Sequence, residues 1–155
     1  MLRILRLCFN ESEIGTHLWG LFAQGSVLPT LRQLSICQCK VTFKDISQFI
    51  LKHRNTLTEL ELGFVDLDNG SLEDVKGFLD KLRDFLRIEY LHLMLLRPDE
   101  KRIGFPLAPQ AWGVDLRDEE EYVMVVKSTR HHVRLDGTQE TKDGLMVLAD
   151  SIVLT

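Results

Sequence analysis

A nine-residue pattern of aliphatic positions, repeated along the chain, is the feature that most restricts its fold. In LRQLSICQC (31–39), aliphatic residues occupy the first, fourth and sixth positions, and a cysteine occupies the ninth. The pattern recurs in LRILRLCFN (2–10), LTELELGFV (57–65) and IEYLHLMLL (88–96). The starts, at positions 2, 31, 57 and 88, lie 29, 26 and 31 residues apart. A period in this range with the spacing L-x-x-L-x-L-x-x-N/C indicates leucine-rich repeats.

The spacing has a physical explanation if each repeat is a short strand that returns through a helix. The fourth and sixth positions are two residues apart on a strand, so their side chains face the same side of the sheet. We expect that side to be the core. The ninth position leaves the strand at a sharp bend, where Asn can bond to buried backbone and Cys fits as a small buried residue. Cys39 is therefore predicted to be buried, whereas Val65 and Leu96 at the same position predict looser bends.

Helical patterns fill the intervals between these segments, with apolar residues recurring at steps of three and four. They cover 11–25, 42–55 and 70–86. We predict that the second helix begins after Thr42 and the third after Ser71, because an aspartate follows each of them by three residues. In the first helix, Leu21 is placed on the apolar face, and Trp19 is predicted to line the same face.

These elements predict an α/β leucine-rich-repeat solenoid, with a curved parallel sheet inside, helices outside, and about four repeats followed by an irregular C-terminal extension. Residues 1–96 would form the repeats, with an open N-terminal end that favours a fragment of a longer protein. Residues 97–121 contain prolines and glycines without a helical period, which predicts a long loop or linker. Residues 122–155 are predicted to hold a short strand at 122–126 and a capping helix with Thr141 as its cap.

Composition and charge argue against several classes of protein. Of the 155 residues, 45% are hydrophobic and 27% are charged, and the net charge is −4. This balance is typical of a globular protein and lacks the basic excess of a nucleic-acid-binding protein. No window approaches about 18 uninterrupted apolar residues, and Arg3 and Arg6 interrupt the first apolar run, so we expect neither a membrane span nor a signal peptide. Three cysteines form no disulfide framework and suit the reducing cytoplasm or nucleus.

Two longer stretches resemble a known family. FILKHRNTLTELELGFV (49–65) and GSLEDVKGFLDKLRDFLRIEYLHL (70–93) resemble the irregular leucine-rich region of fungal F-box-like proteins. The resemblance covers roughly 28–96 and extends more weakly over 1–27. It implies that the repeats hold a substrate for an SCF-type ubiquitin ligase. The F-box, which would bind the ligase adaptor, is absent from this sequence.

The cysteines do not predict a metal site. On a strand, Cys37 is expected to face outward with Cys8, and Cys39 is expected to face inward. Zinc needs four convergent ligands, usually with two to four residues between the cysteines, so we predict no metal.

An enzyme that uses residues 97–140 is the least favoured alternative, with His131 or His132 acting beside Asp118 or Glu120. Neighbouring histidines on an extended chain point in opposite directions, so an exposed polar segment is the simpler interpretation. No nucleophile motif, glycine-rich phosphate loop or H-E-x-x-H occurs. We therefore predict no catalytic residues and no cofactor.

The concave sheet face is the informative surface, because the third, fifth and seventh positions of each pattern point outward. These residues predict a protein-binding surface, since aromatic residues and Met are common at the centres of interfaces. The partner-binding candidates are Arg6, Gln33, Ser35, Glu59, Glu61, Tyr90, His92 and Met94. The leading hypothesis is a non-enzymatic protein–protein interaction module that binds neither nucleic acid nor membrane. A truncated gene product without independent function is the alternative.

Overall fold

The computed structural model describes residues 2–9, 14–25, 27–85, 87–98, 101–104 and 132–154. In chain order its elements are β1 (Ile4–Cys8), α1 (Ile14–Gln24), β2 (Gln33–Thr42), α2 (Phe43–Lys52), β3 (Glu59–Asp68), α3 (Leu72–Phe85), β4 (Tyr90–Met94), β5 (Arg97–Pro98), β6 (Ile103–Gly104), β7 (His132–Asp136), α5 (Thr138–Ser151) and β8 (Val153–Leu154).

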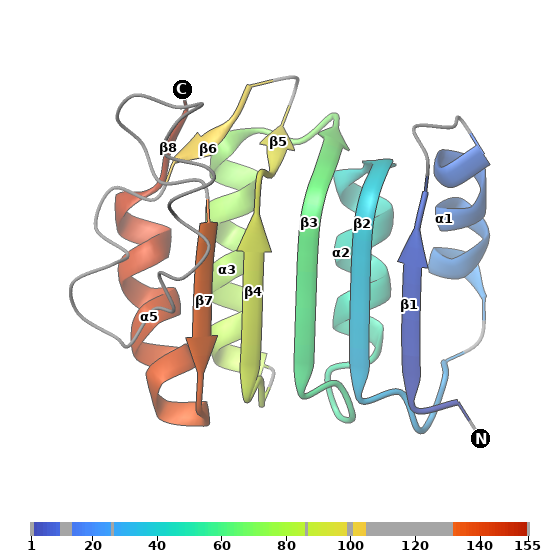
Figure 1. Cartoon of the computed structure of the whole chain (residues 1–155), viewed down its shortest axis with the longest axis horizontal. Helices are drawn as coiled ribbons and strands as arrows, with labels where there is room; N and C mark the ends of the chain where they lie inside the picture. The colour runs from blue at the N-terminus through green and yellow to red at the C-terminus, as the bar shows by residue number, and fades with distance from the viewer. Residues whose placement is uncertain are drawn as a thin grey trace.

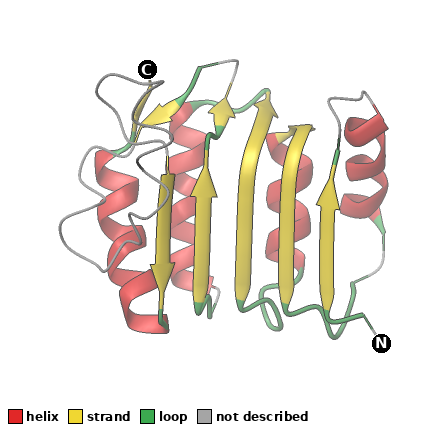
Figure 2. Cartoon of the chain, viewed as in Figure 1, coloured by secondary structure: helices red, strands yellow, loops and turns green. Residues whose placement is uncertain are grey.

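A mostly parallel sheet forms one layer of the molecule (Figure 1). Its order is β1-β2-β3-β4-β7, in which the first four strands run parallel and β7 runs antiparallel beside β4. The short β5 pairs with the end of β3, and β6 pairs with β8 in a separate two-stranded sheet. The helices of the described ranges all cover the same face of the main sheet (Figure 2). The predicted α/β class with a parallel sheet is therefore confirmed.

The aliphatic positions of the repeated pattern lie side by side in this sheet. Leu5 pairs with Leu34, Leu34 with Leu60, and Leu60 with Leu91. The last three are completely buried beneath the helices, whereas Leu5, on the edge strand β1, is half-buried. The predicted strand register and inward direction of these side chains are confirmed.

A left-handed residue explains why the sixth and ninth positions both face the core although they are three residues apart. Gln38, Phe64 and Leu95, each at the eighth position, have φ angles of 51°, 55° and 49°. A residue in this conformation reverses the alternation of side chains along its strand, and the pairing is kept because Gln38 and Phe64 lie at the same level of neighbouring strands. Cys39 is therefore buried, as predicted. The strand does not end there, however, because β2 and β3 each continue for three more residues.

Side-chain caps begin α2 and α3 as predicted. The Asp45 N–H donates to Thr42 Oγ1 at 3.1 Å, and the Thr42 hydroxyl donates to the Asp45 carboxylate at 2.7 Å. The Asp74 N–H donates to Ser71 Oγ at 3.1 Å, and the Ser71 N–H donates to the Asp74 carboxylate at 2.9 Å. Each pair satisfies backbone donors that a helix start leaves without an intrahelical partner.

The final helix begins earlier than predicted. Gly137 precedes it with a φ of 94°, a conformation that glycine adopts without steric cost, and α5 starts at Thr138. The prediction that Thr141 is the cap is wrong, because Thr141 lies inside the helix and is buried. Leu145 and Leu148 do pack into the core as predicted.

The apolar face of α1 is narrower than predicted. Trp19 is fully buried, but Leu21 is 56% exposed, because α1 lies at the end of the helix layer, where it packs on α2 and β2 (Figure 1). The C-terminal end of α1 is capped by Lys52 of α2. The Lys52 ammonium donates to the carbonyls of Ala23 at 2.6 Å and Gly25 at 2.7 Å. The placement of Leu21 on the buried face is therefore wrong.

The segment predicted to be a loop or linker contains short strands at its start. Pro98 of β5 and Ile103 of β6 are both buried. Antiparallel β7 and the pair of β6 with β8 were not predicted. The strand predicted at 122–126, and the rest of the predicted loop from residue 105 onward, lie outside the described residues.

Candidate partner-binding face

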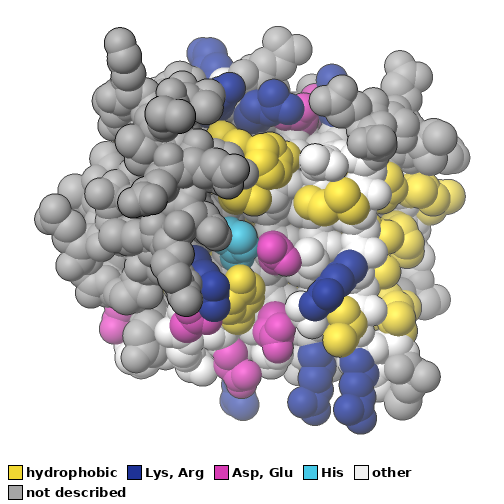
Figure 3. Space-filling view, in the orientation of Figure 1, with side chains coloured by type: hydrophobic (Ala, Val, Ile, Leu, Met, Phe, Trp, Pro, Cys, Tyr) yellow, Lys and Arg dark blue, Asp and Glu magenta, His cyan; other side chains and the backbone are white. Residues whose placement is uncertain are grey.

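The sheet face opposite the helices carries the residues predicted to bind a partner. Strands β1 to β4 and β7 alternate side chains between the two faces, and no helix of the described ranges covers this side (Figures 1 and 3). We call this surface the open face. Its outward residues are Ile4, Arg6, Cys8, Gln33, Ser35, Cys37, Glu59, Glu61, Gly63, Tyr90, His92, Met94, Arg134 and Asp136.

A hydrogen-bonded cluster occupies the centre of the open face. Ser35 Oγ donates to Glu61 Oε2 at 2.7 Å, and His92 Nδ1 lies 3.0 Å from Glu61 Oε1. A carboxylate only accepts, so Nδ1 carries the proton in this contact. The three residues come from neighbouring strands, and the register places Ser35 opposite Glu61 and Glu61 opposite His92. The structure thus brings together three of the predicted site residues.

The Glu61 carboxyl is held in its ionised form. Burial raises its pKa, but hydrogen bonds from Ser35 and His92 and the electrostatic effects of His92 and Arg6 outweigh burial and lower that pKa. Arg6 reaches this position because β1 places it opposite Ser35. The cluster therefore presents a fixed negative charge between groups that donate hydrogen bonds.

An aromatic and cationic pair adjoins the cluster. The Arg134 guanidinium lies over the Tyr90 ring, 5.2 Å from its centroid, and donates to Asp136 at 3.1 Å. The Tyr90 and His92 rings stand edge-on, with centroids 6.4 Å apart. A guanidinium over an aromatic face is attracted by the ring's electrons and adds to the rigidity of the site. The sequence interpretation missed Arg134, although the alternation of Val133 and Leu135 around it indicates a strand.

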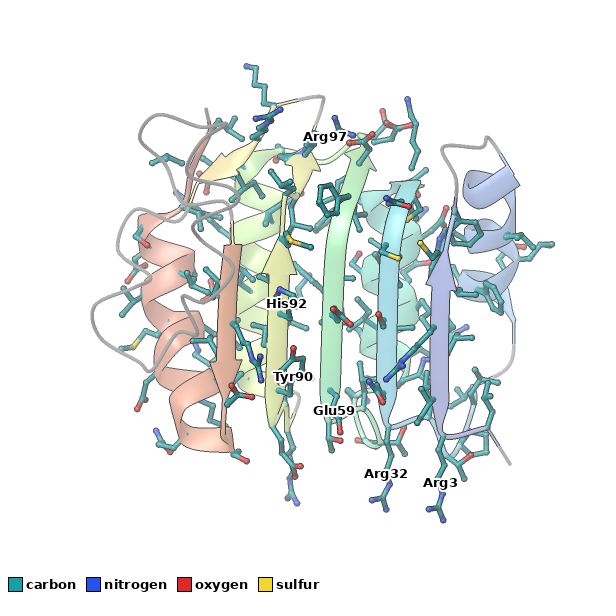
Figure 4. All side chains as sticks on the ribbon, viewed as in Figure 1. Arg3, Arg32, Glu59, Tyr90, His92 and Arg97 are labelled. Carbon is teal, nitrogen blue, oxygen red and sulfur yellow. The ribbon has the colours of Figure 1, made fainter. Side chains whose placement is uncertain are left out.

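The remaining predicted residues lie at the margins of the cluster. Gln33 and Glu59 pair across β2 and β3, and Met94 extends over Gly63, where an added Cβ would be 3.3 Å from the Met94 methyl carbon. Figure 4 shows Glu59 at the start of β3, below Tyr90 and His92, with Arg3 and Arg32 projecting beside it. Figure 3 shows the acidic side chains and a histidine near the middle of this face, with basic side chains below.

A second set of charges lies beyond the left-handed residues Gln38 and Phe64, near the ends of the strands. Arg97 donates to Asp66 at 2.9 Å, and Lys40 lies 3.3 Å from Asp68. These pairs join β5 to β3 and β2 to β3 across the sheet. The sequence interpretation missed them because it ended the strands at the ninth position. Since each charge has a partner of opposite sign, this end of the face favours a neutral or polar contact.

The cluster does not have the arrangement of a serine hydrolase. In such enzymes the imidazole lies between the serine and the carboxylate, so that it can remove the hydroxyl proton. Here Glu61 lies between Ser35 and His92, and its carboxylate accepts from both. A serine that donates to a glutamate is not activated by the imidazole. His92 is therefore not placed to remove the Ser35 proton.

The other candidate groups add no chemistry within the described ranges. His131, Asp118 and Glu120 lie outside them, and His132 is placed only as the first residue of β7. Among the residues that the structure describes, no three of His, Cys, Asp and Glu are grouped to hold a metal ion. The helices in this part of the chain include none long and apolar enough to cross a membrane.

Comparisons with known proteins identify no relative: no family model, no curated protein and no solved structure matches the chain. The function is therefore inferred from the geometry of the open face and from the sequence pattern.

Proposed function

We propose that the protein is a non-enzymatic interaction module that binds a protein partner through the open face. The observation that carries the proposal is the asymmetry of the sheet. One face is packed beneath the helices, and the other presents a preassembled row of Ser35, Glu61 and His92 beside Tyr90. Side chains that are already held in place lose little conformational entropy on binding, which favours affinity.

The charges on this face indicate the chemistry of the partner. Arg3, Arg6 and Arg32 lie on the β1 and β2 side, and Glu59 and Glu61 lie on β3 (Figure 4). A complementary surface would place acidic groups opposite the arginines and basic groups opposite the two glutamates. Tyr90 would supply the apolar contact at the centre, because its ring is half-buried and held by Arg134.

The finer version of the proposal follows from the repeated pattern. The chain would be part of a leucine-rich-repeat solenoid related to fungal F-box-like proteins, acting in the cytoplasm or nucleus as the substrate-recognition part of a ubiquitin ligase subunit. The four parallel strands in common register support a repeat, because each contributes the same two inward positions. Contact with the ligase adaptor would require an F-box, which this sequence does not contain.

Affinity capture with a matched control tests the proposal. The chain is immobilised beside a variant carrying Arg6→Ala, Glu61→Ala and His92→Ala, and retained proteins are identified by mass spectrometry. A control variant carries Lys44→Ala, Gln48→Ala and Lys142→Ala, which are exposed positions on α2 and α5. We expect specific partners to be lost from the first variant and retained by the control. Loss from both variants, or from neither, would contradict binding through the open face. Ligase subunits among the retained proteins would support the finer version.

A further inference from the structure

Two cysteines lie next to each other on the open face. Cys8 of β1 and Cys37 of β2 are directly paired in the sheet register, and both side chains point away from the helices. Cys8 is exposed, Cys37 is half-buried, and both are free thiols. They lie in the row that follows Arg6 and Ser35 along these two strands. The pair is thus separate from the Glu61 cluster but shares its surface.

Several contacts hold the two thiols together. The Cys8 side chain lies close enough to Cys37 to raise the pKa of the Cys37 thiol. The Phe9 N–H donates to the Cys37 carbonyl at 3.1 Å, which fixes β1 against β2 at this level. The Cys8 thiol also donates to Gln38 Oε1 at 3.5 Å, and the left-handed conformation of Gln38 brings this side chain to the same face. The two cysteines are therefore held side by side on neighbouring strands before any reaction.

The strand geometry is compatible with a covalent bond between them. Neighbouring strands are about 4.8 Å apart, and disulfides join residues whose Cα atoms are roughly 4.4–6.8 Å apart. β1 is an edge strand, so it can shift slightly without disturbing a second neighbour.

We propose that Cys8 and Cys37 form a reversible cross-strand disulfide by exchange with a small-molecule disulfide of the glutathione type. Disulfides in reducing compartments are usually transient and redox-sensing. This site goes beyond the proposed function and does not depend on it. Formation of the bond would fix the end of β1. It would also fix Arg6, which is two residues from Cys8 and helps to lower the pKa of the Glu61 carboxyl.

The reaction proceeds in two exchange steps. Cys8, as the more exposed thiol, loses its proton and attacks one sulfur of oxidised glutathione. A bond to Cys8 forms, the glutathione disulfide breaks, and one glutathione thiolate leaves and takes up a proton. Cys37 then loses its proton and attacks the Cys8 sulfur, which releases the second glutathione in the same way. Two protein thiols are oxidised, and one oxidised glutathione is reduced to two glutathione thiols.

The order of attack follows from the environments of the two sulfurs. Burial, and then the neighbouring Cys8 thiol, raises the pKa of the Cys37 thiol to about 11. Cys37 is therefore protonated near neutral pH and is the poorer first nucleophile. Once Cys8 carries glutathione, its thiol no longer raises the pKa of Cys37, so the second attack becomes easier.

Counting thiols on the folded chain tests the inference. The protein is equilibrated with mixtures of reduced and oxidised glutathione, quenched with acid, denatured, alkylated with N-ethylmaleimide and weighed as an intact protein. We expect the number of alkylated cysteines to fall from three to one, with the loss of two hydrogens and no added glutathione. Retention of three thiols in every mixture would overturn the inference. So would a stable glutathione adduct on Cys8, or a covalent dimer.

Three variants identify the cysteines involved. Cys39 faces the core, where burial raises the pKa of its thiol to about 12, so it should remain reduced. Cys39→Val, which introduces the residue found at the equivalent position 65, should still form the internal disulfide. Cys8→Ser and Cys37→Ser should each abolish it. An internal disulfide in Cys8→Ser would assign the bond to Cys37 and Cys39 and overturn the inference.

Discussion

The two ends of the main sheet close the core in different ways. At the β1 end, the inward residues Leu5 and Leu7 are only half-buried, although they occupy the same positions of the pattern as fully buried leucines farther along. At the β7 end, Val133 and Leu135 are completely buried. β7 runs antiparallel to β4, and α5 packs behind it against α3 (Figure 1).

This contrast separates what the repeated pattern determines from what it does not. The pattern determines the direction in which a side chain points, and Leu5 and Leu91 do point the same way. Burial depends on the neighbours that each strand acquires. β1 and β7 both lie at an edge of the described sheet, but α5 packs against β7, whereas α1 packs on β2 and α2. A leucine of the pattern therefore contributes to stability according to its place in the sheet.

A charge introduced at equivalent positions should affect the two ends very differently. Leu91→Asp buries a carboxylate with no partner at a site that is 0% exposed, and we expect it to unfold the protein, a loss of more than about 4 kcal/mol. Leu5→Asp should leave a folded protein, because water reaches the half-buried edge position. Circular dichroism and urea unfolding measure both. Similar losses for the two variants would show that β1 is as well covered as β4.

A glycine in α5 should test how closely the β7 end is packed. A Cβ on Gly144 would lie 2.6 Å from one methyl carbon of Leu135 and 2.8 Å from the other, and Leu135 is fully buried. Gly144→Ala should therefore destabilise the protein by about 1–3 kcal/mol. Gly77→Ala in α3 is the matched control, since nothing lies within 4 Å of its Cβ position. It should stabilise by roughly 0.5–1 kcal/mol. Urea unfolding that shows stabilisation by both variants would mean that the helix approaches β7 less closely.

The parts of the fold that the sequence predicts are those that depend on local spacing. The register of Leu34, Leu60 and Leu91 follows from the period, because each repeat places its strand at the same point. The caps at Thr42 and Ser71 follow from residues three positions apart. By contrast, β7 could not be predicted from the period, because it belongs to no repeat and pairs in the opposite direction.

The candidate site shows the same division. Because Ser35, Glu61 and His92 share the fifth position of their patterns, the sequence places them in one row. Their hydrogen bonds depend on side-chain rotamers and distances that the pattern does not contain. The contacts made by the end of α2 with α1 and the loop after it could not be predicted from the pattern either. Lys52 bonds to the end of α1, and His53 bonds to Leu28, across 25 or more residues of sequence.

Protonation of His53 should loosen the β1 end. His53 Nδ1 donates to the Phe49 carbonyl at 2.7 Å, and Nε2 accepts from the Leu28 N–H at 2.9 Å, so the ring is neutral. Burial lowers its pKa below the ordinary 6.5. The unfolded chain therefore binds the proton first. The stabilisation is complete above pH 6.5 and is lost as the pH falls from there through the lower pKa of the folded state.

Urea unfolding of the wild type and of His53→Gln measures this effect. A glutamine can donate to one carbonyl and accept from one N–H but does not titrate in this range. We expect the wild type to lose stability relative to His53→Gln between about pH 7 and about pH 5. Parallel stability curves over that range would show that His53 does not respond to pH. The comparison with His53→Gln removes the contributions of the other histidines.

The smallest effect is expected at an outward position of the same edge strand. Ile4 is 50% exposed on the open face and directly precedes the half-buried Leu5. Ile4→Lys should change the free energy of unfolding by no more than about 0.5 kcal/mol, because the new ammonium remains in water. The two substitutions at positions 4 and 5 thus form a test of register within one strand. A shift of one residue exchanges the two faces of a strand. If Ile4→Lys destabilised the protein more than Leu5→Asp in urea unfolding, the faces of β1 would be reversed, and Arg6 and Cys8 would point toward the helices.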